Sequence, residues 1–148
     1  MANGQKRVPF AAQVAELKKK PVTTSTEPTF NHIFACWRIQ KIQMVDPYGW
    51  HELDMQQIEY VRGKLAEFET RTWNTIFVDE KKRNHPIPVA ELDCPDAREW
   101  MRDNMPDEDT LWTLRFSGPE RVWGIFRNGA YHILFYDPHH RIKLSPKK

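Results

Sequence analysis

The chain has 148 residues, of which 40% are hydrophobic and 12% aromatic, and its formal net charge is +2. These values are typical of a single globular domain that buries a core without disulfides, and they exclude a wholly disordered chain. The two cysteines have no CxxC spacing, so neither a disulfide framework nor a zinc ribbon is indicated, and both are predicted to lie in the core. No apolar run approaches the roughly 18 residues of a membrane span, and we expect a cytoplasmic protein without membrane contact.

Charge is unevenly distributed along the chain. Residues 28–110 carry ten basic and sixteen acidic residues, whereas residues 111–148 carry seven basic and two acidic residues. The acidic middle argues against a protein that coats nucleic acid generally. The basic C-terminal third can present a positive face that holds phosphate, or its charges can simply be a solvated sheet face and a tail.

The first 28 residues differ in composition from the rest. The stretch PVTTSTEP has no apolar periodicity and follows the three lysines Lys18–Lys20. One apolar helical turn between Phe10 and Leu17 is too short to be stable alone in water. We therefore predict a flexible N-terminal arm over residues 1–28 and a single domain over residues 29–148.

Periodicity predicts secondary structure from residue 31 onward. Alternation in NHIFACWRIQKIQ predicts a first strand over Asn31–Gln43. Asp54 can cap a helix on which apolar residues recur at helical spacing, at positions 58, 61, 65 and 68. A second helix is expected to open at Asp93, with Pro95 in its first turn, and to end near Pro106.

Three strands are predicted in the C-terminal part, over Leu111–Ser117, Arg121–Arg127 and Ala130–Tyr136. The short connections GPE and NG require antiparallel neighbours, so these strands form a meander. The predicted fold class is α+β, with an antiparallel sheet of about four strands, two main helices on one face and the element order βααβββ.

The second face of this sheet is predicted to be solvated or used for binding. Alternation leaves on it a polar set that includes Arg115, Ser117 and Arg121. Periodicity does not decide which side of the middle strand is buried, so Trp123 belongs either to this face or to the core.

Standard catalytic motifs are absent from the sequence. There is no GxxxxGK[ST], GxGxxG or GxSxG, so P-loop nucleotide hydrolysis, dinucleotide binding and serine hydrolase chemistry are not supported. Asp137, His139 and His140 in YDPHH are suitable metal ligands. Adjacent histidines on an extended segment point to opposite sides, however, and no HxxxH partner is present. We therefore expect no metal site and no cofactor.

The same segment is compatible with acid and base chemistry on a phosphodiester. Cleavage of RNA needs a base for the 2′-hydroxyl, an acid for the leaving oxygen and fixed positive charge near phosphorus. His139 and His140 suit the first two roles, and Arg121 suits the third because its guanidinium fork matches phosphate oxygens. Arg115 and Lys143 would add positive charge to the same surface. The simpler alternative is that DPHH is only a turn that ends the strand.

The segment LRFSGPERVWGIFRNGAYHILFYDPHHRI resembles the C-terminal signature of a family of small, uncharacterised bacterial and phage proteins, which pairs R-V-x-G with D-P-x-H. The earlier segments PYGWHELD and KLAEFETRTWNTI resemble the same family, so the resemblance covers most of the chain from about Phe30. It implies family membership but no particular reaction.

A second resemblance implies an activity. The element order, the Arg-Val pair that opens a central strand and the histidines after the last strand are similar to the RelE/HigB group of bacterial toxins, which bind the ribosome and cut messenger RNA. The resemblance implies that Arg121 is the sheet arginine and that His139 or His140 is the terminal catalytic residue. It also implies phosphate contacts by Arg115 and Lys143. This chain is longer than those toxins, and its middle is acidic.

We therefore expect a toxin-like, metal-independent endoribonuclease that acts on RNA in association with the ribosome. Trp123 and Tyr136 are expected to be exposed near Arg121, where aromatic rings can stack on bases. The alternative is a non-catalytic protein-binding module of a toxin-antitoxin or phage-defence system, because exposed aromatic and arginine residues also anchor interfaces. Its partner would be a cognate antitoxin or another protein. Convergence of Arg121 and both histidines on one open groove would favour the enzyme, whereas pairing of Arg121 with Asp137 and burial of the histidines would favour the binding module.

Overall fold

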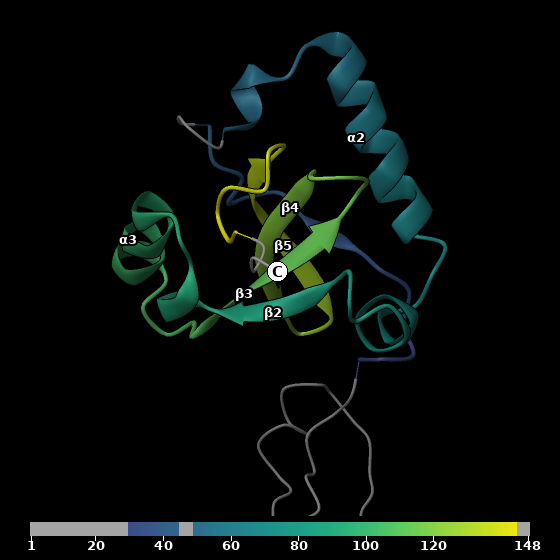
Figure 1. Cartoon of the computed structure of the whole chain (residues 1–148). Helices are drawn as coiled ribbons and strands as arrows, with labels where there is room; N and C mark the ends of the chain where they lie inside the picture. The colour runs from purple at the N-terminus through teal and green to yellow at the C-terminus, as the bar shows by residue number, and fades with distance from the viewer. Residues whose placement is uncertain (1–29, 45–48, 145–148) are drawn as a thin grey trace, which may run out of the picture.

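A five-stranded mixed sheet forms the centre of the structure, a computed structural model that describes residues 30–44 and 49–144 (Figure 1). The strands lie in the order β1-β5-β4-β3-β2. Strand β1 pairs in parallel with β5, and the other neighbours are antiparallel. The strands are β1 (Trp37–Arg38), β2 (His85–Pro88), β3 (Thr110–Arg115), β4 (Arg121–Arg127) and β5 (Ala130–Asp137).

The predicted α+β class and the C-terminal meander are confirmed, but two strands differ from the prediction. Only two residues within Asn31–Gln43 pair as β1, and they pair in parallel. Strand β2 is not predicted by the sequence pattern, because Pro86 and Pro88 lie within it. Proline lacks the N–H that a central strand needs, yet an edge strand tolerates it. The sheet therefore has five strands and one parallel pair instead of about four antiparallel strands.

The two main helices form close to where they are predicted, although the second has Cys94 and not Asp93 as its N-cap. Helix α2 (Met55–Phe68) begins after Asp54, whose carboxylate accepts a hydrogen bond from Gln57 N at 2.8 Å, while the Gln57 side chain accepts one from Asp54 N. Helix α3 (Pro95–Asn104) has Pro95 as its first residue. Short helical turns lie at η1 (Trp50–Glu52), η2 (Thr75–Asp79) and η3 (Val89–Glu91).

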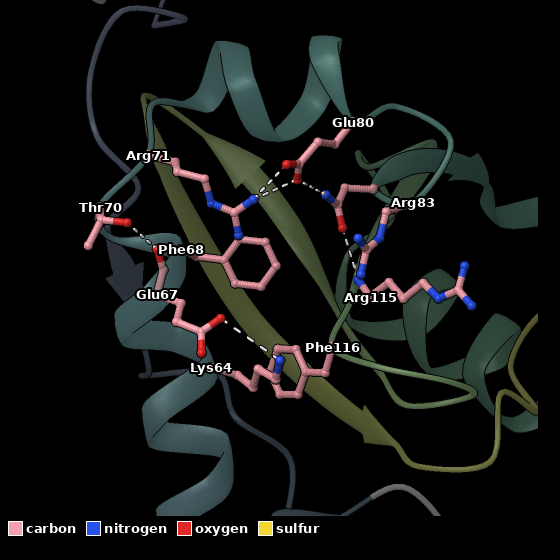
Figure 2. A pocket seen from close by; sticks show the side chains of 10 residues that line it. Lys64, Glu67, Phe68, Thr70, Arg71, Glu80, Arg83, Arg115 and Phe116 are labelled. Carbon is pink, nitrogen blue, oxygen red and sulfur yellow. Dashed lines mark hydrogen bonds and ion pairs between the residues drawn. The ribbon is translucent and has the colours of Figure 1, made fainter.

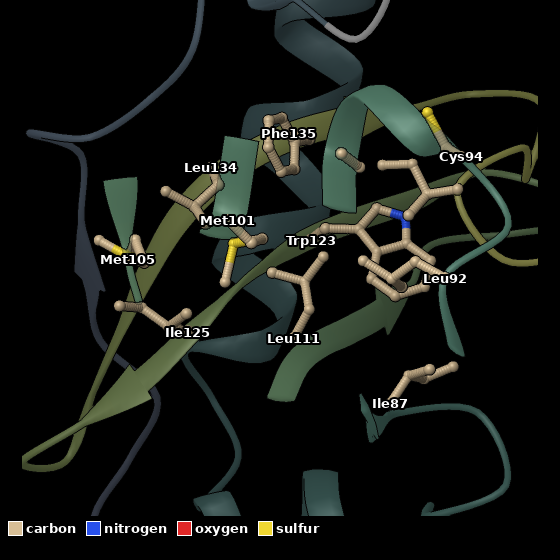
Figure 3. Close-up of a cluster of buried hydrophobic side chains, with 12 residues drawn as sticks. Ile87, Leu92, Cys94, Met101, Met105, Leu111, Trp123, Ile125, Leu134 and Phe135 are labelled. Atoms are coloured by element: carbon tan, nitrogen blue, oxygen red, sulfur yellow. The ribbon is translucent and has the colours of Figure 1, made fainter. Parts of the chain in front are cut away.

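The two helices cover opposite faces of the sheet (Figure 1). Helix α2 packs in a buried cluster that includes Val122 of β4, whereas α3 packs in a second cluster that includes Trp123 and Ile125 of the same strand (Figure 3). The prediction of both helices on one face is therefore wrong. Its physical reason is that β4 carries apolar side chains on both sides, so each face of the sheet needs a covering layer.

Three further sequence predictions concern the ends and the surface of the chain. The predicted arm over residues 1–28 lies outside the described residues. Of the two cysteines predicted to lie in the core, Cys94 is buried but Cys36 is exposed. Within residues 30–44 and 49–144, no helix is both long and apolar enough to cross a membrane.

Candidate functional site

A buried carboxylate anchors the segment that follows β5. The Asp137 side chain is fully buried and accepts hydrogen bonds from Trp123 Nε1 at 3.2 Å and from the backbone N–H groups of Arg141 and Ile142 at 2.9 Å each. Several N–H donors compensate much of the cost of burying a carboxylate. Asp137 therefore fixes the DPHH turn to the end of the sheet.

The chain then returns to the start of helix α3. Ile142 is buried in the α3 cluster, and its carbonyl oxygen accepts hydrogen bonds from Asp93 N at 2.8 Å and Cys94 N at 3.2 Å. Within the turn, the backbone of His140 has a φ of 57°. This left-handed conformation is uncommon for a residue other than glycine. The turn places His140, half-buried, in the lining of a cavity and leaves His139 exposed.

The cavity has a volume of about 370 Å³, and we call it the basic cavity. Three neighbouring strands contribute to it. His85 of β2 is the register partner of Thr113 on β3, and Thr113 is in turn the partner of Trp123 on β4. Two residues farther along, Arg115 pairs with Arg121. Register partners share a face of the sheet, so these side chains gather on the α3 side. The residues that line the basic cavity are Lys82, Arg83, His85, Ile87, Thr113, Arg115, Arg121, Trp123, His140, Lys143 and Leu144.

Most of the predicted site residues meet in the basic cavity. The predicted residues that line it are Arg115, Arg121, Trp123, His140 and Lys143, and those that do not are His139 and Tyr136. Arg121 therefore shares an open cavity with one of the two histidines and not with the other.

The two aromatic residues predicted to be exposed are buried. Trp123 is fully buried (Figure 3). Its indole N–H donates to Asp137, so the ring forms part of the cavity wall and not a stacking platform. Tyr136 lies in the α2 cluster on the other face, where its hydroxyl donates to Glu120 Oε2 at 3.0 Å. Burial and the Glu120 carboxylate hold the pKa of Tyr136 far above its ordinary value. The prediction fails because helices cover both faces of the sheet.

Positive charge is concentrated in the basic cavity. Lysine and arginine make up five of its eleven lining residues and histidine two more, and no aspartate or glutamate of the described chain lines it. One of these cations reaches a carboxylate outside the lining, because Lys143 Nζ lies 3.7 Å from Asp93. The arrangement favours an anionic ligand over a cationic one.

Arg121 is held in place by the turn between β3 and β4. Its Nη1 donates to two backbone carbonyl oxygens of that turn, at 2.7 and 3.1 Å. Burial lowers the pKa of Arg121, and the positive charges of Arg115 and Arg83 lower it further, whereas Asp137 acts in the opposite direction. These arginines are thus close enough to repel one another.

His140 responds to the same charges. Burial lowers its pKa, with contributions of the same sign from Arg121 and Arg115. His85 acts in the same direction, and Asp137 acts in the opposite one. A histidine with a lowered pKa is neutral at neutral pH and can accept a proton.

Lys82, Arg83 and His85 are cavity residues that the sequence patterns do not single out. They belong to KKRNHPIP, which lies in a polar connection between the two predicted helices. The available signal is the basic run Lys81–Arg83, which only Asn84 separates from His-Pro-Ile-Pro. Alternation over four residues with prolines is compatible with a short edge strand, and an edge strand beside β3 would bring these residues to the cavity.

A second cavity, of about 400 Å³, shares Arg83 and Arg115 with the basic cavity (Figure 2). We call it the ion-paired cavity, because Arg71 Nη1 lies 2.7 Å from both carboxylate oxygens of Glu80. Figure 2 shows the Arg115 side chain pointing away from Arg71 and Glu80. The residues that line the ion-paired cavity are Lys64, Glu67, Phe68, Thr70, Arg71, Glu80, Arg83, Asn84, Arg115 and Phe116.

The function of the site is indicated neither by a group of metal-binding side chains in the described residues nor by similarity to known proteins. Across the described ranges, no three histidine, cysteine, aspartate or glutamate side chains gather in a way that could hold a metal ion. No protein-family model, no curated protein and no solved structure matches this chain. The two resemblances found in the sequence therefore stay predictions.

Proposed function

We propose that the protein is a toxin-like, metal-independent endoribonuclease and that the basic cavity is its active site. The observation that carries the proposal is the meeting of His140 with Arg121 and Arg115 in a cavity lined by no described acidic residue. RNA phosphates are anionic, so the arginines and lysines that line this cavity attract and hold them. A neutral imidazole beside such a phosphate can take a proton from the adjacent ribose.

In the proposed reaction, His140 accepts the proton of a 2′-hydroxyl, and the resulting oxygen attacks the adjacent phosphorus. The bond from phosphorus to the 5′-oxygen of the next nucleotide breaks, which leaves a 2′,3′-cyclic phosphate. His85, the other histidine that lines the cavity, donates a proton to the departing oxygen. Arg121 stabilises the additional negative charge on the phosphorus oxygens, since its guanidinium stays charged and can donate two hydrogen bonds.

A non-catalytic protein-binding module of a toxin-antitoxin or phage-defence system is the second candidate function. It is supported by exposed apolar side chains close together in the sequence around β1. Phe34, Ile39 and Met44 are 60%, 69% and 59% exposed. Large exposed apolar residues that cluster on a surface are typical of protein interfaces. The partner of such a module would be a cognate antitoxin or another protein. If the protein is instead the endoribonuclease, the expected partner is the ribosome.

Substitution of the two adjacent histidines tests the proposal. We expect His140→Ala to reduce RNA cleavage by about 10²- to 10⁴-fold, as loss of a general base does. His139→Ala is the matched control and should leave cleavage nearly unchanged, because His139 is exposed and lies outside the basic cavity. The measurement is cleavage of messenger RNA by wild type and both variants, with and without ribosomes, beside the thermal midpoint of each protein.

The outcomes separate the two candidate functions. Wild-type protein that cuts RNA neither alone nor with ribosomes would favour the protein-binding module. Equal losses in both variants, or a loss in His140→Ala that coincides with unfolding, would contradict the role assigned to His140.

A further inference from the structure

Buried polar atoms without a hydrogen-bond partner are concentrated in the basic cavity. In the described part of the chain, four buried side-chain atoms lack a partner: Trp37 Nε1, His85 Nδ1, Thr113 Oγ1 and Arg115 Nε. The last three belong to residues that line the basic cavity. Buried polar atoms in proteins are nearly always satisfied, so three such atoms in residues that line one cavity point to a group that binds beside them.

Strand pairing brings these three residues together. His85 and Thr113 are register partners, and Arg115 follows Thr113 by two residues on the same face of β3. Asn84 fixes the backbone beside them, because its Oδ1 accepts from Arg115 N at 2.9 Å and its Nδ2 donates to Ile76 O at 3.1 Å. Thr113 is only 2% exposed. Its hydroxyl is therefore held on a rigid part of the sheet.

The chemistry of these atoms selects the class of ligand. The Nε–H of Arg115 can only donate, and the Thr113 hydroxyl and the His85 imidazole can each donate. A cation would be repelled by the arginine and lysine side chains that line the same cavity. An apolar group would leave all three polar atoms without partners. An oxyanion satisfies the donors and the positive charge together.

We propose that His85, Thr113 and Arg115 form a subsite for the non-bridging oxygens of one phosphate group. This subsite rests on the proposed function in one respect: the phosphate group that it binds is assigned to an RNA backbone. It gives Thr113 a binding role that is separate from acid and base chemistry, since its hydroxyl donates to a phosphate oxygen. The neighbouring Arg121 then stabilises the charge that develops on the same phosphate.

Inorganic phosphate is the probe for this subsite. We expect it to bind wild type with a saturable change in the imidazole NMR signals of His85 and His140. Thr113→Val should weaken this binding by about tenfold or more, as loss of a hydrogen bond to a charged group predicts. Thr113→Ser keeps a hydroxyl and should retain most of the affinity. Thr110→Val, on the same strand but outside the basic cavity, is the matched control and should bind like wild type.

A second arm identifies the source of the phosphate. A single-stranded DNA oligonucleotide has backbone phosphates but no 2′-hydroxyl, so it cannot be cleaved by the proposed reaction and should displace inorganic phosphate. Unchanged affinity in Thr113→Val, or no saturable binding to wild type, would overturn the subsite. An oligonucleotide that does not displace phosphate would overturn its assignment to a nucleic-acid backbone. Both arms measure binding, so failure of the subsite and failure of RNA cleavage are observed separately.

Discussion

The two cavities share Arg83 and Arg115, yet they differ in whether an arginine contacts a carboxylate. Figure 2 shows the ion-paired cavity. In the ion-paired cavity, Arg71 contacts both carboxylate oxygens of Glu80, and its guanidinium lies 4.7 Å from the centre of the Phe68 ring. In the basic cavity, the arginines lie among lysines and histidines. The difference teaches that arginine is structural where it contacts a carboxylate directly, as Arg71 does, and available to a ligand where it makes no such contact.

The two arrangements also differ in what they contribute to folding. The Arg71 and Glu80 side chains are each 31% exposed, and an ion pair at such a site contributes on the order of 1 kcal/mol or less. In the basic cavity, neighbouring cations repel one another, which helps to lower the pKa of Arg121. An anion would relieve this repulsion. We therefore expect ligand binding to stabilise the protein through the basic cavity.

Between the two cavities, the largest expected difference is in the effect of an arginine substitution on RNA cleavage. Arg121→Ala should reduce RNA cleavage by about 10²- to 10³-fold, the size expected for loss of a charge-stabilising donor. Arg121→Lys should rescue poorly, because a point charge does not reproduce the guanidinium fork. Arg71→Ala should cleave nearly as wild type does, since Glu80 already engages Arg71. The cleavage assay with thermal midpoints measures this, and equal losses at both arginines would contradict the distinction between the cavities.

The next largest effect concerns the stability of the protein, and it compares the loss of a carboxylate that contacts the wall of the basic cavity with the loss of one in the ion-paired cavity. Asp137→Ala removes the acceptor of Trp123 Nε1 and of two backbone N–H groups, and should lower the free energy of unfolding by about 2–4 kcal/mol. Glu80→Ala breaks the partly exposed ion pair and should cost about 1 kcal/mol. Denaturant unfolding of both variants gives the comparison. A smaller loss for Asp137→Ala than for Glu80→Ala would show that Asp137 does not anchor the DPHH turn.

Local signals account for the parts of the fold that the sequence predicts correctly. Asp54 and Gln57 form a capping box, Pro95 opens α3, and Asn128 and Gly129 turn the chain between β4 and β5 with positive φ at both residues. Each signal depends on residues only a few positions apart. Strands β1 and β2 instead pair with β5 and β3, far along the chain, and short-range alternation does not detect such pairing.

The residues of the candidate site also divide into those that local sequence signals predict and those that they do not. Arg115 and Arg121 are predictable because neighbouring strands of one meander carry them. His85 is not, because it reaches the cavity only through the edge strand β2. The sequence alone does not distinguish His139 from His140, because both are histidines at adjacent positions. Only the left-handed backbone of His140 and the anchored turn decide which of them enters the cavity.

The smallest expected effect is also the most informative about the basic cavity. Burial and neighbouring cations lower the pKa of His140 from its ordinary value of 6.5. The neutral imidazole therefore contributes stability that is present above about pH 6.5 and is lost as the pH falls through the lowered value in the folded protein. Bound phosphate favours the protonated imidazole, so it should raise the pKa of His140 and reduce this loss.

The most direct test of phosphate binding in the basic cavity is an NMR titration of His140 with pH, in the absence and presence of saturating inorganic phosphate. We predict that phosphate raises the pKa of His140 in wild type and does so much less in Thr113→Val. The NMR signals of His32, which is exposed and lines neither cavity, should not change when phosphate is added at constant pH. A His140 titration that phosphate leaves unchanged would contradict the assignment of the basic cavity as a phosphate-binding site.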